Sequence, residues 1–143
     1  MADEVVVWSE LHGYRSLCLV GMGGSGVAVA TGLQLRIFES HGLSFRVEIP
    51  PKKYERNHRS IRGKIWRGPD YILIVDDFVD TGETFRTILR RLKQNGQIGL
   101  VRGVAMLETS SRNGRAMEYT ILALGAFQKD LTMTVDVFCA DND

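Results

Sequence analysis

Residues 72–85 read ILIVDDFVDTGETF, and this stretch decides how the whole sequence is interpreted. The apolar run YILIV at 71–75 is typical of a fully buried strand, and two carboxylates, Asp76 and Asp77, follow it directly. From Glu83 to Lys93 apolar side chains recur at helical spacing, with basic residues between them. A buried strand that ends in paired carboxylates and leads into a helix predicts a ligand site at the strand end.

The turn DTGET at 80–84 has the composition of a phosphate-binding turn. The first N–H groups of a helix have no partner inside the helix, and the helix dipole favours an anion there. Gly82 lets the backbone approach a ligand closely, and the hydroxyls of Thr81 and Thr84 add donors. The sequence therefore predicts that a phosphate group binds where this helix begins.

The carboxylate pair Asp76–Asp77 is placed to accept hydrogen bonds from a diol or to hold hydrated Mg²⁺. A simpler interpretation is that Asp80 or Thr81 caps the helix, with Glu83 or Thr84 completing the first turn. Capping accounts for one or two of these residues. It does not account for a carboxylate pair that abuts a buried strand, so the ligand interpretation is favoured.

The composition is that of an ordinary soluble globular protein. The 143 residues are 44% hydrophobic and 24% charged, with a formal net charge of +1. The sequence has no apolar run long enough to cross a bilayer, and its acidic start, MADE, does not suit a signal peptide. Cys18 and Cys139 have no metal-ligand spacing and form no disulfide framework. We expect a single domain over 1–143, located in the cytoplasm.

Strands and helices are expected to alternate along the chain. The expected helices are 27–38, a nearly all-apolar segment buried between the sheet and its neighbours, and 83–93. The expected strands are 17–22, 43–49, 71–75, 100–107, 119–124 and, at an edge, 131–138. This alternation predicts an α/β fold with a parallel sheet covered on both faces. Ligands of such sheets bind beyond the carboxyl ends of the strands, which is where both glycine-containing turns fall.

The second glycine-containing turn is LVGMGGSGV at 19–27, which contains the pattern G-x-G-x-x-G of dinucleotide-binding folds. An NAD site also requires an acidic residue at the end of the second strand, and Glu48 is near the right distance. Pro50 and Pro51 follow at once, and the NAD interpretation leaves 76–84 unexplained. A phosphate-binding turn of another kind is favoured.

A basic, irregular segment interrupts the alternation. Residues 46–67 contain eight Lys or Arg residues against Glu48 and Glu55. A long loop of this kind inside a compact domain is usually functional. A solvated hairpin arm and a nucleic-acid patch are the alternatives, and the latter is disfavoured because only Tyr54 and Trp66 supply aromatic rings.

The stretch VDDFVDTGETF at 75–85 resembles the binding motif for phosphoribosyl diphosphate (PRPP) of the type I phosphoribosyltransferases. In that family an apolar run is followed by two acidic residues, a few further residues and then T-G-x-T. The resemblance implies a type I phosphoribosyltransferase-like fold of the α/β class, with a central, mostly parallel sheet flanked by helices and a small hood. It also implies that Asp76 and Asp77 contact the ribose 2- and 3-hydroxyls, directly or through Mg²⁺-bound water. The residues that would wrap the 5-phosphate are Asp80, Thr81, Gly82, Glu83 and Thr84.

The same resemblance implies roles for residues outside that motif. Asp80 occupies the position of an aspartate close to the purine N7 in hypoxanthine-guanine enzymes, which makes it a candidate general base and favours a purine acceptor. The glycine turn carries no lysine, so pyrophosphate would be held by backbone amides and by the Ser25 hydroxyl. The turn residues concerned are Gly23, Gly24 and Ser25. The basic segment, about 50–67, matches the mobile catalytic loop of the family, with Lys52, Lys53, His58 and Arg59 as counterparts of its basic residues and Lys53 and His58 as catalytic candidates.

The expected reaction is Mg²⁺-dependent transfer of the phosphoribosyl group of PRPP to a nucleobase-like acceptor, with release of pyrophosphate. The alternative is a non-catalytic regulator of the same fold that binds PRPP or a nucleotide. By resemblance we expect a homo-oligomer, and neither a membrane nor a nucleic-acid partner. The hood of the family binds the base and is built from the chain ends; here Trp8, Phe127 and Phe138 either stack on a base or pack.

Overall fold

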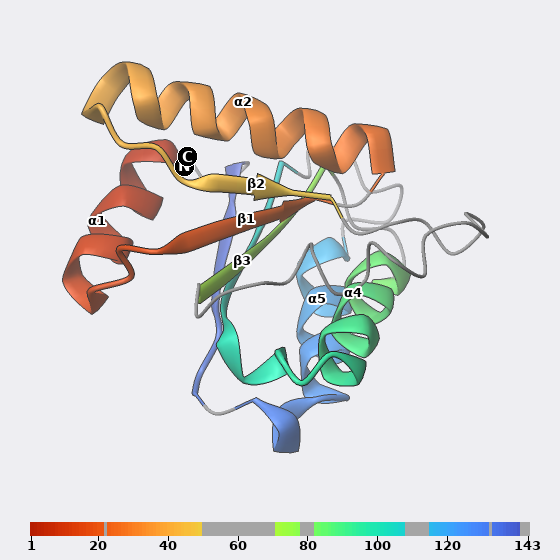
Figure 1. The fold of residues 1–143 in the computed structure, drawn as a ribbon. Helices are drawn as coiled ribbons and strands as arrows, with labels where there is room; N and C mark the ends of the chain where they lie inside the picture. Colours follow the sequence, from red (N-terminus) through yellow and green to blue (C-terminus); the bar gives the residue numbers. More distant parts are fainter. Residues whose placement is uncertain (22, 50–70, 78–81, 108–114, 132, 141–143) are drawn as a thin grey trace.

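The computed structural model describes residues 1–21, 23–49, 71–77, 82–107, 115–131 and 133–140 (Figure 1). No helix within these ranges is long and apolar enough to cross a bilayer. The helices are α1 (Ala2–His12), α2 (Gly23–His41), α4 (Glu83–Gln94) and α5 (Ala116–Gly125), with short 3-10 turns at Ile98–Leu100 and Gln128–Asp130. The strands are β1 (Leu17–Gly21), β2 (Arg46–Glu48), β3 (Tyr71–Asp76), β4 (Val101–Met106) and β5 (Asp136–Cys139).

The five described strands form one sheet in the order β2-β1-β3-β4-β5, and every neighbouring pair is parallel. This confirms the predicted α/β class and the parallel sheet. The strand order reverses between β1 and β3, whose last residues lie side by side, with Gly21 opposite Val75.

The core of the protein lies on the two faces of this sheet. Successive side chains of a strand point to opposite faces, so the residues of β3 divide between two clusters. Ile72 and Ile74 pack with residues of α4 and α5, whereas Leu73 and Val75 pack with residues of α1 and α2. Figure 1 shows these two pairs of helices on opposite sides of the sheet.

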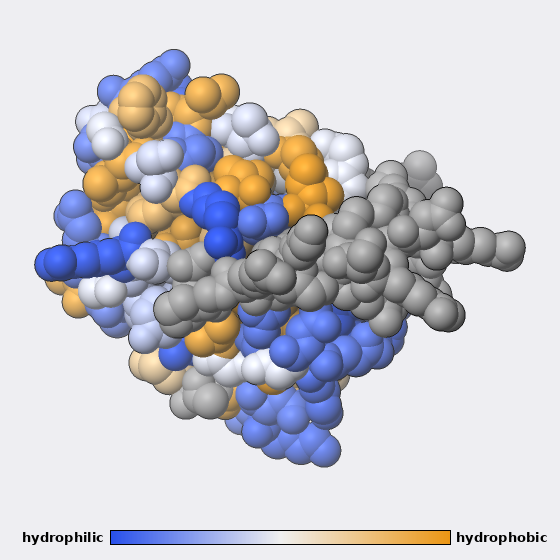
Figure 2. All heavy atoms as spheres, viewed as in Figure 1, coloured by the Kyte–Doolittle hydropathy of each residue, from blue (hydrophilic) through white to orange (hydrophobic). Residues whose placement is uncertain are grey.

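Helix α4 confirms the prediction for 83–93. Its buried residues are Phe85, Ile88, Leu89 and Leu92. The charged residues of the same helix are exposed or half-buried, and hydrophilic spheres lie in the region of α4 in Figure 2. The helix ends at Gln94, and Gly96 follows with a φ of +71°, so the predicted stop at 94–96 is confirmed.

The strand predicted at 119–124 is wrong, because this segment belongs to helix α5. A short apolar run does not distinguish a strand from a helix by its periodicity. Ala116, Thr120 and Ala123 are buried at helical spacing, while Ile121 is 58% exposed. One side of the helix therefore faces the core, while Ile121 and Leu122 of the apolar run face solvent.

Two other segments differ from their predictions. Helix α2 is longer than 27–38 and is buried along one side only, through Gly26, Ala30, Leu33 and Ile37. Leu35 and Phe38 are each 56% exposed, so the expected burial on all sides is wrong. The sheet covers only one side of a helix in the outer layer. The strands predicted at 43–49 and 131–138 form over shorter ranges, as β2 and β5.

The residues before β1 form α1, an element that the apolar pattern did not predict. Trp8 of α1 is 7% exposed, its ring centroid lies 5.1 Å from that of Phe138, and its Nε1–H donates to Asp136 Oδ2 at 2.8 Å. Phe127 is also buried, in the cluster beneath α4 and α5. These three aromatic rings, which the sequence left open between base stacking and packing, pack in the described core.

Replacing Trp8 with phenylalanine is expected to lower the free energy of unfolding by about 2–4 kcal/mol, because the hydrogen bond to a carboxylate is lost and the smaller ring leaves part of the buried space empty. Urea unfolding followed by circular dichroism measures this change. Asp136→Ala should cost less in the Trp8→Phe background than in the wild type. Equal costs in the two backgrounds would show that the hydrogen bond contributes nothing.

Candidate functional site

The two glycine-containing turns follow β1 and β3, which are neighbouring strands of the sheet. Because Gly21 pairs with Val75, the Asp76–Asp77 pair lies directly beyond the last residue of β1. Helix α2 starts at Gly23 and helix α4 at Glu83, so each strand leads into a helix at this edge. A parallel sheet in which the strand order reverses has its ligand crevice at this point. The strand ends and helix starts that bound the two turns thus lie at the predicted carboxyl edge.

The glycines of the first turn have different steric surroundings. A Cβ added to Gly21 would lie 2.4 Å from the carbonyl oxygen of Gly26, and a Cβ on Gly26 would lie 3.4 Å from the carbonyl oxygen of Val75. Gly21 and Gly26 therefore let α2 pack closely against the ends of β1 and β3. A Cβ on Gly24 would meet nothing within 4 Å. Packing thus explains the first and last glycines of G-x-G-x-x-G but not Gly24.

The other residues of the first turn lie at the start of α2. Gly23 has a φ of +70°, a conformation that residues with a side chain rarely adopt. Gly24 and Ser25 are exposed, so their backbone and the Ser25 hydroxyl are accessible to a ligand. Of the three residues predicted to hold pyrophosphate, Gly24 and Ser25 are thus exposed and Gly23 is half-buried at the carboxyl edge of the sheet.

The carboxylate of Asp76 is buried, with 5% of the residue exposed. It follows Ile72 and Ile74 on the alternating pattern of β3, which directs it to the face covered by α4 and α5. Its Oδ1 accepts a hydrogen bond of 2.9 Å from the backbone N–H of Asp77. The carbonyl oxygen of Asp77 accepts one of 2.9 Å from the N–H of Leu107, which fixes the strand end against β4.

The pKa of Asp76 is raised from 3.8 to about 7, chiefly by burial and in smaller part by the side chain of Asp77. The N–H of Asp77 opposes this shift because it donates to the carboxylate. The buried carboxylate therefore lacks enough positive partners within the described chain. A cation or a pair of hydroxyl donors would stabilise the charge of this carboxylate. A carboxylate in a crevice whose pKa is strongly shifted is a candidate functional group.

The start of α4 is also fixed by a glycine. Gly82 is the N-cap residue with a φ of +77°, and a Cβ there would lie 2.8 Å from the carbonyl oxygen of Tyr119 in α5. The first helical hydrogen bond runs from Arg86 N–H to Gly82 O at 3.0 Å. Because a glycine has no side-chain oxygen, the N-cap position itself supplies no side-chain cap. This weakens the interpretation of the turn as a simple helix cap.

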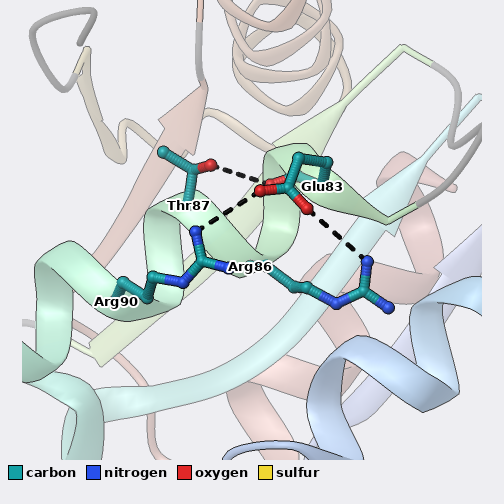
Figure 3. A network of polar contacts seen from close by, with 4 residues as sticks. All are labelled: Glu83, Arg86, Thr87 and Arg90. Carbon is teal, nitrogen blue, oxygen red and sulfur yellow. Dashed lines mark hydrogen bonds and ion pairs between the residues drawn. The ribbon is translucent and has the colours of Figure 1, made fainter.

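Glu83, the first residue of α4, lies in a polar network that was not predicted from the sequence (Figure 3). Its Oε1 lies 3.3 Å from Arg90 Nη1 and its Oε2 lies 3.7 Å from Arg86 Nη1. Its carbonyl oxygen accepts a hydrogen bond of 2.9 Å from the Thr87 hydroxyl. The spacing of Glu83, Arg86 and Arg90 along one helix face was the signal available in the sequence.

Several predicted site residues lie outside the described part of the chain. These are Asp80, Thr81, Lys52, Lys53, His58 and Arg59, together with the rest of the basic loop at about 50–67. The described members of the predicted site are Asp76, Asp77, Gly82, Glu83, Thr84, Gly23, Gly24 and Ser25.

Within the described ranges no group of three or more His, Cys, Asp or Glu side chains is arranged to hold a metal ion. Asp76 and Asp77 form a pair of carboxylates at one strand end. Mg²⁺ in phosphate-processing sites needs only one or two carboxylates, because water and substrate oxygens complete its coordination. The donor set thus fits a Mg²⁺ ion that arrives with a phosphorylated substrate.

No protein-family model and no curated protein sequence matches the chain. Solved structures do match it. Orotate phosphoribosyltransferase from Francisella tularensis superimposes with a TM-score of 0.54 at 12% identity, over 97% of this chain and 63% of that one. Adenine phosphoribosyltransferase from Saccharomyces cerevisiae, complexed with an imino-altritol bisphosphate and adenine, gives a TM-score of 0.53 at 15% identity, over 97% and 74%. This chain thus spans less than two thirds of the orotate enzyme, and it has the fold of the type I phosphoribosyltransferases.

Proposed function

We propose that this protein is a Mg²⁺-dependent phosphoribosyltransferase that transfers the 5-phosphoribosyl group of PRPP to a nucleobase-like acceptor and releases pyrophosphate. The observation that carries the proposal is the buried Asp76 beside Asp77 at the point where the strand order reverses. The fold supports it, because the similar yeast structure is complexed with a phosphorylated sugar analogue and a base. Transfer to a preformed base is the chemistry of nucleotide salvage, and Asp80 favours a purine as the acceptor.

In the proposed mechanism a nitrogen of the acceptor attacks the anomeric carbon of the ribose while the bond to the pyrophosphate oxygen breaks. Asp76 and Asp77 accept hydrogen bonds from the ribose hydroxyls and orient the ring. The N–H groups at the start of α4, with the hydroxyls of Thr81 and Thr84, hold the 5-phosphate. Asp80 accepts the proton that the acceptor nitrogen loses.

The leaving group needs its own stabilisation. The exposed backbone at the start of α2 and the Ser25 hydroxyl hold the pyrophosphate that leaves. Lys53 and His58 of the basic loop supply a positive charge and a proton donor to it, and loop closure excludes water. Mg²⁺, held by Asp76 and Asp77 together with substrate oxygens, would neutralise part of the pyrophosphate charge.

A non-catalytic regulator of the same fold is the second candidate. It would use the same Asp76–Thr84 region to bind PRPP or a nucleotide without consuming it. The missing lysine in the turn at 23–25 favours this candidate, because a positive charge at the pyrophosphate would then come only from the basic loop and Mg²⁺. We further propose that the protein acts in the cytoplasm as a homo-oligomer.

The proposal is tested by incubating the protein with PRPP, Mg²⁺ and a panel of purine and pyrimidine bases while pyrophosphate release is measured. Release with one of the bases is expected. Asp80→Asn and Thr81→Ala should each lower its rate by at least about tenfold, because a proton acceptor or a phosphate donor is lost. PRPP binding without release for any base would overturn the transferase and favour the regulator.

A further inference from the structure

The helix that is proposed to bind phosphate carries an anion of its own in its first turn. Glu83 directly follows the N-cap residue Gly82. A carboxylate in the first turn of a helix interacts favourably with the positive end of the helix dipole, as a bound phosphate does. A phosphate at this helix start would also be repelled by the Glu83 charge. A phosphate site here therefore needs a means of directing and neutralising that carboxylate.

The structure shows such a means within α4 itself. Both carboxylate oxygens of Glu83 face arginines that lie further along the helix, Oε1 toward Arg90 and Oε2 toward Arg86 (Figure 3). Residues three, four and seven positions apart share one face of a helix, so these contacts draw the carboxylate along the side of α4. The Arg86 side chain is 28% exposed, which limits its freedom to leave the pair.

We propose that Arg86 and Arg90 are positioning residues, which hold the Glu83 carboxylate along α4 and neutralise it so that the N–H groups at the start of the helix stay open to phosphate. The identity of this anion as the PRPP 5-phosphate rests on the proposed function. Without the arginines the carboxylate is free to swing back toward the helix start, where it repels or displaces the ligand. The arginines thus act on phosphate binding through Glu83.

The exposure of these side chains sets how strongly the ion pairs affect phosphate binding. The side chains of Glu83 and Arg90 are 60% and 55% exposed, so water screens their interaction. Losing both ion pairs is therefore expected to weaken phosphate binding about 3- to 10-fold, whereas loss of a buried charge partner would have a much larger effect. Because α4 is held by its buried apolar face, its folding should not depend on these two arginines.

A double-mutant cycle tests the proposal. Arg86→Ala/Arg90→Ala is prepared in the wild type and in the Glu83→Gln background, and binding of Mg²⁺-PRPP and of inorganic phosphate is measured by calorimetry. The affinity loss of about 3- to 10-fold should shrink to less than about twofold when Glu83 carries no charge. Arg90→Lys should retain most of the affinity. Lys93→Ala is the matched control, because Lys93 is a cation of the same helix that pairs with Asp130 at 3.0 Å.

The outcomes separate this inference from the proposed function. An equal affinity loss in both backgrounds, or a loss as large in Lys93→Ala, would reduce the effect to net charge and overturn the inference while leaving the function intact. If PRPP does not bind but inorganic phosphate shifts the amide resonances of Gly82 and Thr84, and the cycle still couples to Glu83, the inference stands and the function fails. If neither anion binds at the start of α4, both are wrong.

Discussion

Replacing Asp76 with asparagine is expected to stabilise the protein near pH 8 and to weaken Mg²⁺-PRPP binding by about 100-fold. Burial disfavours the charge of this carboxylate, whereas an amide of the same shape has no charge to desolvate. Binding is lost because the amide no longer provides a charged acceptor for a ribose hydroxyl or a ligand for Mg²⁺. Calorimetry measures the affinity, and urea unfolding measures the stability.

The stability gain depends on pH in a defined direction. The pKa of Asp76 is raised from 3.8 to about 7, so between these values the folded protein retains a proton that the unfolded chain has released. The wild type should therefore lose stability as the pH rises through this range. The difference between Asp76→Asn and wild type should be near zero at about pH 3 and reach about 2–4 kcal/mol above about pH 8.

Asp77→Asn provides the comparison for this prediction. Asp77 is only half-buried, so the substitution should also weaken PRPP binding but give little gain in stability. If Asp76→Asn were less stable than the wild type at about pH 8, the carboxylate would have stabilising partners that the proposed site does not include. If it bound PRPP as well as the wild type, Asp76 would have no part in the site.

Replacing Gly21 with alanine is expected to lower the free energy of unfolding by about 3 kcal/mol or more. The added Cβ would lie 2.4 Å from the oxygen and 2.6 Å from the carbon of the Gly26 carbonyl, and 2.9 Å from the nitrogen of Val27. All three atoms belong to the backbone of α2, so no side chain can move aside and the helix itself must shift. Urea unfolding checks the expected loss.

Gly24→Ala is the matched control, because it adds the same methyl group in the same turn where nothing lies within 4 Å. Its stability should be unchanged or slightly higher, since alanine suits a helix better than glycine does. If Gly24 approaches pyrophosphate as proposed, the methyl group should lower PRPP affinity severalfold. Similar stability losses in both variants would contradict the different roles that the structure assigns to these glycines.

The sequence by itself determined the elements whose pattern is local and unambiguous. The apolar run 71–75 and the helical period of 83–93 each occur in one continuous segment, and both elements form as predicted. The alternation of strands with helices predicted a parallel sheet, and the chirality and connection rules of such sheets place both turns at the carboxyl edge. The sequence thus predicted which described residues lie at this edge, while their part in binding stays a prediction.

Only the tertiary structure decided the roles that depend on neighbours distant in sequence. The segment 119–124 is a helix because its small residues fit against the core, which its apolar run did not show. Gly21 and Gly24 are both glycines of one turn, yet only at Gly21 would a Cβ meet the backbone of α2. Asp76 and Asp77 are adjacent carboxylates, yet of the two only Asp76 is buried, because alternation along β3 turns it toward the face that α4 and α5 cover. Burial, steric contact and pKa are properties of a residue's surroundings, and those surroundings exist only once the helices have packed on the sheet.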